Sequence, residues 1–441
     1  MGIIIFLAAF AAEIALAVLC IRTKSYHYRI RRIVRIVSLS TILLLMVWLV
    51  IRWSLSYHAL IGLLLIFALI GAAVLVPRKD ERRAYNTVRV VMKGTGMTVL
   101  IFVLTLPAIV FPEYRMIEAS GEYQVAAATS TYIDNNRVET FTDTGAFRAL
   151  NVGLWYPENA QRKYPLIIFS HGGISSRSSN ESLYHELASN GYVVCSIDHT
   201  YHSLFTTDEN GRTILIDIGY LRELNREDAK SDRQQSYEYY QEWMKTRTGD
   251  ISFVIDYILS EATNETSDQV YRVVDTARIG VIGHSLGGSA ALGIGRMRDD
   301  VSAVIALEAP FLCDIEGVED GEFVFVSVAY PVPLLNVYSD SSWSHLSEWP
   351  QYRQNYNLLS DTSATVFNVH IAGAGHFSLT DLALTSPLLT RMLNGFRSTT
   401  GAESLLKAIN RISMGFFDCY LKGKGEFTPE SPAQMRIEDL Q

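Results

Sequence analysis

Residues 278–288 read RIGVIGHSLGG. The first part is an apolar run of the kind that forms a buried strand, and a segment rich in Ala, Leu and Gly follows the last glycine. The spacing Gly-His-Ser-Leu-Gly predicts a sharp turn from strand to helix with Ser285 at its apex, because glycines two residues away on either side leave room for a strained serine backbone. Such a turn raises the hydroxyl of Ser285 above the edge of a sheet as a nucleophile. The alternative is an ordinary Gly/Ser turn between a strand and a helix.

Short apolar runs alternate with helical patterns on both sides of this turn. Strands are predicted at 149–156, 166–170, 192–197, 279–283, 301–307, 332–338 and 365–371, with edge strands at 123–128 and 138–142. Helices are predicted at 182–189, 250–260 and 286–297. This alternation predicts an α/β fold with a mostly parallel, doubly wound sheet, in which functional residues gather at the carboxyl ends of the strands.

Candidate partners for the serine stand where later strands end. Glu308 and Asp340 each follow a predicted strand, and either carboxylate could orient a histidine. His376 follows the last strand through a glycine-rich loop, which lets an imidazole reach back over the sheet. The chain order serine, acid, histidine is that of α/β hydrolases. His284, next to the serine, is expected only to pack in the interior.

A second glycine loop follows the strand at 166–170, where the sequence reads His171-Gly-Gly. Because glycine lets the backbone approach a ligand closely, the amides of Gly173 and Leu286 are the expected donors of an oxyanion hole. An ordinary glycine turn is the alternative. The pair His199 and His202 has no third ligand nearby in the sequence, so neither a metal nor another cofactor is expected.

The N-terminal quarter of the chain is strongly apolar. Four stretches are close to the ~20 residues that a helix needs to cross a bilayer, and they cover 2–21, 33–51, 57–76 and 94–111. Lys and Arg gather between the first two and the last two stretches, so both of these loops are expected to be cytoplasmic. The prediction is a multi-pass protein of the cell membrane with everything after Phe111 on the extracytoplasmic side. Glu13, in mid-span, is expected either to have a function in the bundle or to pack there uncharged.

The predicted organisation is a four-span transmembrane region (1–112), a linker with edge strands (113–147), a hydrolase domain (148–425) with a cap insertion (203–248), and a C-terminal tail (426–441). The net charge of −8 over 441 residues, with no basic block in the later two thirds, makes nucleic acid an unlikely partner. Cys313 and Cys419 could form a disulfide if the domain faces an oxidising compartment. The oligomeric state stays open.

The region 148–385 resembles the plasma-type platelet-activating factor acetylhydrolases, which are serine esterases of the α/β hydrolase fold. The motifs that carry the resemblance are Leu154-Trp-Tyr-Pro, Phe169-Ser-His-Gly, His199, Gly283-His-Ser-Leu-Gly-Gly, Ile305-Ala-Leu-Glu and the loop of His376. The resemblance implies Ser285 as nucleophile, His376 as base and position 308 as acid. The family has aspartate where this chain has Glu308, so Asp340 stays a candidate. The four spans are not part of the secreted members of that family.

The resemblance also implies a calcium-independent, phospholipase A2-type activity on esters with short or oxidised acyl chains. The expected function is therefore that of a membrane-anchored serine esterase that acts on an ester or phospholipid at the lipid bilayer. Two alternatives remain open at this stage. The same triad could transfer an acyl group to an alcohol, or the fold could bind a lipid without catalysis.

Overall fold

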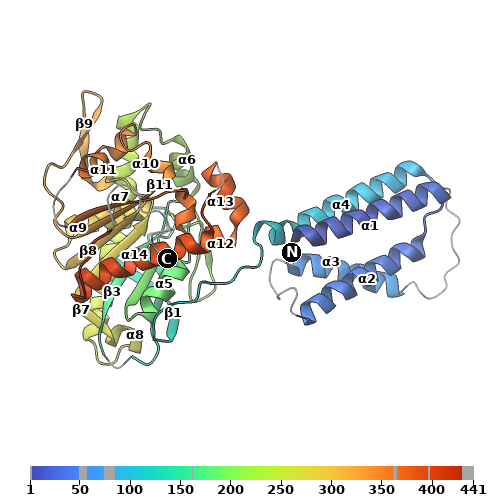
Figure 1. Cartoon of the computed structure of the whole chain (residues 1–441), viewed down its shortest axis with the longest axis horizontal. Helices are drawn as coiled ribbons and strands as arrows, with labels where there is room; N and C mark the ends of the chain where they lie inside the picture. The colour runs from blue at the N-terminus through green and yellow to red at the C-terminus, as the bar shows by residue number, and fades with distance from the viewer. Residues whose placement is uncertain are drawn as a thin grey trace. The chain divides into compact units, whose positions relative to one another are not determined.

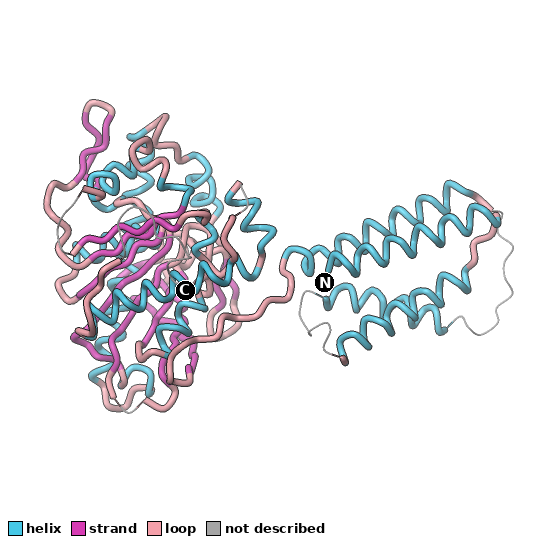
Figure 2. The backbone as a smooth tube through the Cα atoms, in the orientation of Figure 1, coloured by secondary structure: helices cyan, strands magenta, loops and turns pink. Residues whose placement is uncertain are grey.

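The computed structural model describes residues 2–48, 57–73, 85–160, 162–360, 365–395 and 398–429. The chain divides into two compact units, of which the first comprises residues 1–115 and 384–389 and the second the remainder. The first unit is a group of long helices, and the second is built on a sheet covered by helices (Figures 1 and 2). The predicted tail lies outside the described residues from 430 onward.

The first unit contains one helix for each predicted span: α1 (Gly2–Thr23), α2 (Tyr28–Val47), α3 (His58–Ala73) and α4 (Thr87–Val110). Among the described residues, only α1 and α4 are both long and apolar enough to cross a membrane by length and composition. Helix α2 begins with a basic turn, and α3 has only 16 described residues. The ends of the second and third predicted spans, at 49–51 and 74–76, lie outside the described residues.

A buried ion pair lies inside this helical unit. Arg35 Nη2 is 3.0 Å from Glu13 Oε1, so Glu13 of α1 has a cationic partner on α2. The same guanidinium lies 4.3 Å from the ring centre of Phe67 in α3, and its Nη1 lies 3.6 Å from the sulfur of Met97 in α4. Arg35 stands near the start of the second predicted span, and in the structure it lies within α2, where it contacts a side chain from each of the other three helices.

The second unit is organised around an eight-stranded sheet in the order β1-β2-β4-β3-β7-β8-β11-β12. Its strands are β1 (Val125–Val138), β2 (Phe147–Pro157), β3 (Tyr164–Ser170), β4 (Val193–Asp198), β7 (Val274–His284), β8 (Val301–Leu307), β11 (Leu334–Ser339) and β12 (Val366–Ile371). The pairs β1–β2 and β2–β4 are antiparallel, and all the others are parallel. The predicted mostly parallel sheet is thus confirmed. The two short edge strands are not, because β1 is one 14-residue strand that pairs with β2 along its length.

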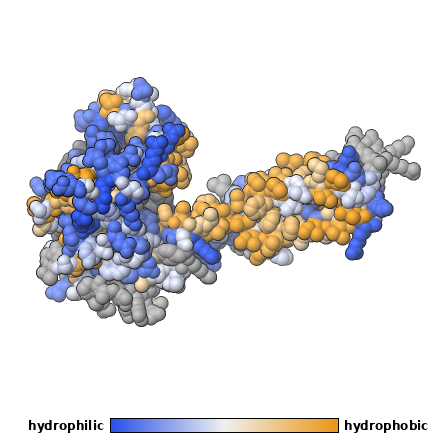
Figure 3. Space-filling model, turned by 90° about the horizontal axis from the view of Figure 1, so that it is seen from above, coloured by the Kyte–Doolittle hydropathy of each residue, from blue (hydrophilic) through white to orange (hydrophobic). Residues whose placement is uncertain are grey.

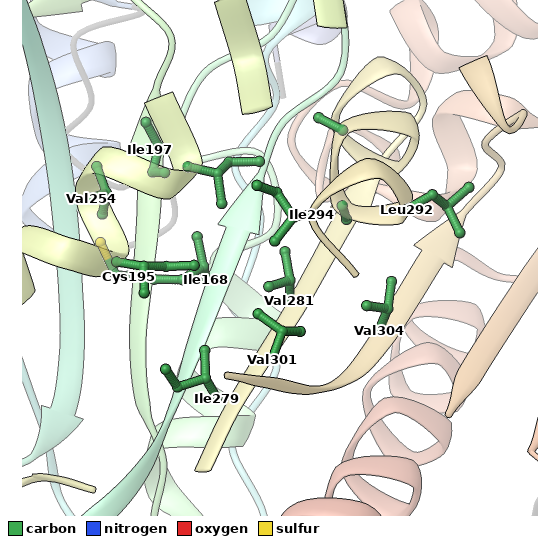
Figure 4. Close-up of a cluster of buried hydrophobic side chains, with 14 of the residues drawn as sticks. Ile168, Cys195, Ile197, Val254, Ile279, Val281, Leu292, Ile294, Val301 and Val304 are labelled. Carbon is green, nitrogen blue, oxygen red and sulfur yellow. The ribbon is translucent and has the colours of Figure 1, made fainter. Parts of the chain in front are cut away.

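Helices pack on both faces of this sheet. α5 (Glu181–Ser189) and α14 (Ala402–Lys422) cover one face, and α7 (Arg233–Thr263) and α9 (Leu286–Met297) cover the other. Under α7 and α9 lie fully buried aliphatic and thiol side chains of four neighbouring strands, which Figure 4 shows: Ile168, Cys195, Val281 and Val304, with Val254 and Ile294 of the helices above them. Strands buried on both faces read as continuous apolar runs, which is why the sequence located them closely.

The other described helices and strands are short, and in the chain they lie between or after the strands of the sheet. They are β5 (Phe205–Thr207), β6 (Thr213–Leu215), α6 (Ile218–Arg226), α8 (Gln269–Arg272), β9 (Ile315–Glu319), β10 (Glu322–Phe325), α10 (Asp340–Trp343), α11 (Arg353–Leu358), α12 (Leu382–Thr385) and α13 (Pro387–Asn394). The end predicted for the cap insertion, at 248, lies inside α7, which continues without a break into the core. Cys313 and Cys419 are free thiols; the first packs against α9 and the second is on α14, so the disulfide considered from sequence is not formed.

A buried charge cluster joins α7 to the antiparallel side of the sheet. Asp250 of α7 is fully buried and accepts hydrogen bonds from Arg148 Nε (2.6 Å) and Nη2 (2.7 Å) of β2. Arg137 Nη2 and His199 Nδ1 also bond to this carboxylate, each at 2.9 Å. Burial alone would raise the pKa of Asp250, but the charge of Arg148 and these hydrogen bonds outweigh it and lower that pKa. Asp250 therefore stays ionised in the interior.

Replacing this carboxylate should destabilise the second unit strongly. In Asp250→Ala, the buried Arg148 loses its main counter-ion, and we expect a loss of about 3–5 kcal/mol. The control is Asp256→Ala on the same helix, whose 65% exposed side chain pairs with Arg298 and should contribute about 0–1 kcal/mol. Urea unfolding followed by tryptophan fluorescence gives both values. Equal midpoints for the two variants would contradict a structural role for the cluster.

Candidate active site

Ser285 stands at the turn from β7 to α9 with φ 54° and ψ −125°. Its backbone N–H donates to the carbonyl oxygen of Leu307 at 2.8 Å, which fixes the turn to the neighbouring strand β8. A Cβ atom on Gly283 would lie 2.2 Å from the carbonyl oxygen of Gly287, and one on Gly287 would lie 2.0 Å from that of Ser170. At both positions the added Cβ atom would collide with the backbone, which cannot move aside as a side chain can, so only glycine fits.

A cavity of about 400 Å³ opens beside this serine. Its wall combines polar groups of the strand ends with aromatic and aliphatic side chains of α6, α7 and the loops after β8 and β11. The lining residues include Ser285, Leu286, Glu308 and His376, together with Leu224, Glu227, Tyr240, Trp243, Pro310, Leu312, Ser341, Trp349, Gln351, Tyr352, Leu393 and Asn394. The predicted nucleophile, base and one of the two predicted acids therefore border one cavity, and part of its wall comes from the segment predicted as a cap.

His376 begins a short 3-10 helix after β12 and is held by its backbone. Its N–H donates to Ser341 Oγ at 3.0 Å, and its carbonyl oxygen accepts from His284 Nε2 at 3.0 Å. Burial, with a smaller contribution from His284, holds the pKa of His376 well below 6.5, so its ring is neutral at pH 7. In the described part of the chain, no hydrogen bond joins the side chains of Ser285 and His376. His284 and Ser341 support the loop through contacts that the sequence did not suggest.

The two candidate acids have different partners. Glu308 has φ 53°, is buried, and accepts from the backbone N–H and the hydroxyl (2.9 Å) of Ser339. Burial raises the pKa of Glu308, and these hydrogen bonds oppose the rise. Asp340 accepts from His370 Nε2 and from the N–H of Gly373, both at 2.8 Å. Among the described residues neither carboxylate is bonded to His376, but only Glu308 lines the cavity.

The His-Gly-Gly loop after β3 lies against the serine turn. A Cβ atom on Gly172 would be 3.5 Å from the Cβ of Ser285, and one on Gly173 would be 3.1 Å from Leu286 Cδ1. Within the residues that the structure describes, the backbone N–H groups of Gly173 and Leu286 donate to no protein acceptor. Two unpaired donors next to a serine are what a developing oxyanion requires.

A second Ser-His-Asp arrangement lies under this loop. The hydroxyl of Ser170 is 2.8 Å from His199 Nε2, and His199 Nδ1 is 2.9 Å from Asp250 Oδ2. All three side chains are fully buried and none lines the cavity, so no substrate reaches them. Burial lowers the pKa of His199 to about 4, which keeps its ring uncharged. Among the described residues no group of three or more His, Cys, Asp and Glu could hold a metal ion.

Comparison with known proteins identifies the family. The stretch 149–437, more than half of the chain, matches the family model described as platelet-activating factor acetylhydrolase, isoform II. The chain belongs to this family. Acetylhydrolases of that name from Cavia porcellus and Bos taurus are 22% identical over 286 residues and 23% identical over 282 residues. Each alignment covers 60% of this chain and 59% of the relative, so the chain spans about three fifths of the length of these curated relatives.

A solved structure shows the same fold. A ferulic acid esterase from Streptomyces cinnamoneus superimposes with a TM-score of 0.55 and 22% identity, over 72% of this chain and 96% of its own. Together with the sheet order, this similarity agrees with the predicted α/β hydrolase fold. The N-terminal residues 1–148 are not part of the match to the acetylhydrolase family.

The fit around the serine turn predicts the effect of a single methyl group. In Gly287→Ala, the new Cβ would meet the carbonyl oxygen of Ser170 at 2.0 Å, so the backbone must shift. We expect a loss of about 1–3 kcal/mol or more. The matched control is Gly317→Ala, where nothing lies within 4 Å of the added atom, and a change within about 0.5 kcal/mol is expected. Thermal unfolding of the two variants gives the comparison, and similar melting temperatures would refute the steric argument.

Proposed function

We propose that this chain is a membrane-anchored serine esterase that hydrolyses carboxylic esters, and that its substrates are phospholipids with short or oxidised acyl chains. The observation that carries the proposal is the strained Ser285, which shares one cavity with the neutral imidazole of His376. A neutral imidazole can accept a proton, and a serine hydroxyl needs such a base to become a nucleophile. Membership of the acetylhydrolase family supports the same reaction class.

In the proposed mechanism, Ser285 Oγ attacks the ester carbonyl while His376 takes its proton. The negative charge that develops on the carbonyl oxygen is bound by the N–H groups of Gly173 and Leu286. His376 then gives the proton to the leaving alcohol, and water, activated by the same ring, hydrolyses the acyl-enzyme. These steps use only water and residues of this chain. The hydrogen bond from Ser285 to His376 is expected to form when substrate binds, since catalytic hydrogen bonds are often long in the free enzyme.

We assign Glu308 as the acid that orients His376. It stands at the end of β8, directly beside the strand that carries the serine, and it lines the same cavity. Asp340 is occupied by His370 and by the backbone of Gly373, so it serves the loop that leads to His376 rather than the imidazole itself. The longer side chain of glutamate changes the reach of the carboxylate compared with the aspartate that the resemblance implies.

The volume and the lining of the cavity support a substrate with a small acyl group. Its volume of about 400 Å³ is at the low end of the range of roughly 300–1,000 Å³ typical of ligand sites. Its apolar wall includes Tyr240, Trp243, Trp349 and Tyr352, which suits an ester with a short or modified chain better than a long unbroken one. Tyr240 is fixed by a hydrogen bond of 2.5 Å from its hydroxyl to Glu227 Oε1.

The helices of the first unit support attachment to a lipid bilayer, and we propose that all four cross it, with the esterase unit on the extracytoplasmic side. Large apolar side chains are exposed along them, among them Ile4 at 64% and Leu69 at 62%, and Figure 3 shows this apolar surface. The ion pair of Glu13 and Arg35 is buried between the helices. Apolar groups outside and charged groups inside are the arrangement that lipid favours.

The nucleophile is tested by Ser285→Ala. The variant should fold, fail to react with a fluorophosphonate probe, and lose hydrolysis of p-nitrophenyl acetate by a factor of roughly 10⁶. Unchanged turnover would remove the whole assignment.

The rival functions are tested on the unmodified protein. Absence of probe labelling would favour a lipid-binding role, and acyl transfer to added glycerol in preference to water would indicate an acyltransferase. A membrane-impermeant probe applied to intact cells should label Ser285 only if the site is extracytoplasmic.

The acid is tested by comparing Glu308→Gln with Asp340→Asn. The first should lower kcat by about 10²–10⁴, as loss of a triad carboxylate does. In Asp340→Asn the amide keeps one oxygen that can still accept a hydrogen bond from His370 or from the N–H of Gly373. This variant should therefore lower kcat by less than about tenfold. Steady-state kinetics with p-nitrophenyl acetate give both numbers. The reverse order of effects would make Asp340 the acid.

A further inference from the structure

Arg247 of α7 is fully buried, and its guanidinium bonds to the oxyanion loop. Nη1 donates to the carbonyl oxygen of His171 at 2.6 Å, and Nη2 donates to that of Gly172 at 3.2 Å. In the described part of the chain, no carboxylate lies within ion-pair distance of this side chain, and its Nε has no hydrogen-bond partner. A buried cation is normally paired with an anion, because desolvation of an unpaired charge is costly. This cation is held by the backbone of one loop.

The third carbonyl oxygen of the loop is also bound. The hydroxyl of Tyr220 in α6 donates to the carbonyl oxygen of Gly173 at 3.1 Å. Arg247 Nη2 in turn donates to that hydroxyl at 3.5 Å. Three consecutive carbonyl groups, those of His171, Gly172 and Gly173, are therefore held by two side chains that touch each other, and the carbonyl oxygen of Gly172 also accepts from His171 Nδ1 at 2.6 Å.

The geometry of a peptide group converts this contact into an orientation of the amide. In a trans peptide the C=O and the following N–H point in opposite directions, and the described chain contains no cis peptide. A guanidinium that holds the carbonyl oxygen of Gly172 thus turns the N–H of Gly173 to the other side of the peptide plane. That N–H is one of the two unpaired donors beside Ser285. A positive charge at the carbonyl end also polarises the peptide, and so makes its N–H a stronger donor.

We propose that Arg247, together with Tyr220, is a positioning group for the oxyanion hole. It fixes and polarises the peptide between Gly172 and Gly173, so that the N–H of Gly173 is aimed at the carbonyl oxygen of the ester as negative charge develops there. The inference rests on the proposed function. It adds a role for a residue that touches neither the substrate nor Ser285.

The test compares Arg247→Met, Arg247→Lys and Tyr220→Phe in the full-length protein. Arg247→Met removes both hydrogen bonds to the loop and should lower kcat by about 100-fold, the loss expected for one misplaced oxyanion donor. KM should change by less than about threefold, because the ground-state carbonyl gains little from that donor. Arg247→Lys keeps the positive charge but cannot bond to both carbonyl oxygens at once, so its kcat should lie between those of the unmodified protein and Arg247→Met. Tyr220→Phe should lower kcat about fivefold, as loss of one neutral hydrogen bond does.

The decisive readout is the affinity for a trifluoromethyl ketone, which forms an oxyanion on the serine. Loss of affinity for this analogue should equal the loss of kcat/KM in each variant, whereas damage to the fold alone would lower both only through the fraction of folded protein. The matched controls are Arg298→Met and Tyr330→Phe. The first removes an arginine that bonds to the carbonyl oxygen of Ser252 and to the solvent-accessible carboxylates of Asp256 and Asp300, and the second removes a hydroxyl that donates to the carbonyl oxygen of Leu292. Both controls should keep kcat and analogue affinity.

Each outcome decides the proposal. A folded Arg247→Met with unchanged kcat, or with a loss of kcat that the analogue affinity does not follow, overturns it. If both Arg247 variants fail to fold, Tyr220→Phe decides: unchanged kcat and analogue affinity overturn the proposal, and a parallel loss of both supports it. Failure of the proposed function is distinguishable, because the unmodified protein would then show no turnover that depends on Ser285.

Discussion

The site depends on one close fit, that of the Gly287 backbone against the carbonyl oxygens of Ser170 and His171. A Cβ atom on Gly287 would lie 2.0 Å and 2.5 Å from these oxygens, so the first turn of α9 rests directly on the end of β3. This contact brings the loop after β3 beside the serine turn. Nucleophile and proposed oxyanion donors are therefore adjacent for a steric reason, and the glycines at the turn are what permits it.

Two buried residues of opposite charge on α7 hold the groups that surround this contact. Arg247 and Asp250 are both fully buried and only three positions apart, yet they bind different groups. Arg247 bonds to the carbonyl oxygens of the loop, and Asp250 bonds to Arg148 and His199. Burial is the main reason that the pKa of His171 and of His199 lies below 6.5, and Arg247 lowers both further. The interior around the loop thus contains fixed charges of both signs and neutral histidines.

The helical unit has its own buried charge. Arg35 reaches Glu13, Phe67 and Met97, which come from three different helices. Because an ion pair between apolar helices is stable only when both partners are in place, the pair ties the register of α1 and α2.

The sequence alone determined the parallel strands, the serine turn and the order of candidate residues. Parallel strands are buried on both faces and read as apolar runs, and the turn needs glycine at fixed positions, so both leave local patterns. The sequence could not locate the ends of β1 and α7, because pairing with β2 and packing on the sheet extend both elements past the local signal.

Which groups the candidate carboxylates and the buried arginines bind was decided only by the tertiary structure. Glu308 and Asp340 are equivalent in sequence, since each follows a strand. The φ of 53° at Glu308 and the neighbouring end of β11 direct it to Ser339 beside the cavity, whereas Asp340 meets His370. Arg247 and Arg35 likewise gave no sequence signal, because a buried cation is recognised only by the groups that surround it. Those groups come from distant parts of the chain, and only folding brings them within hydrogen-bond distance.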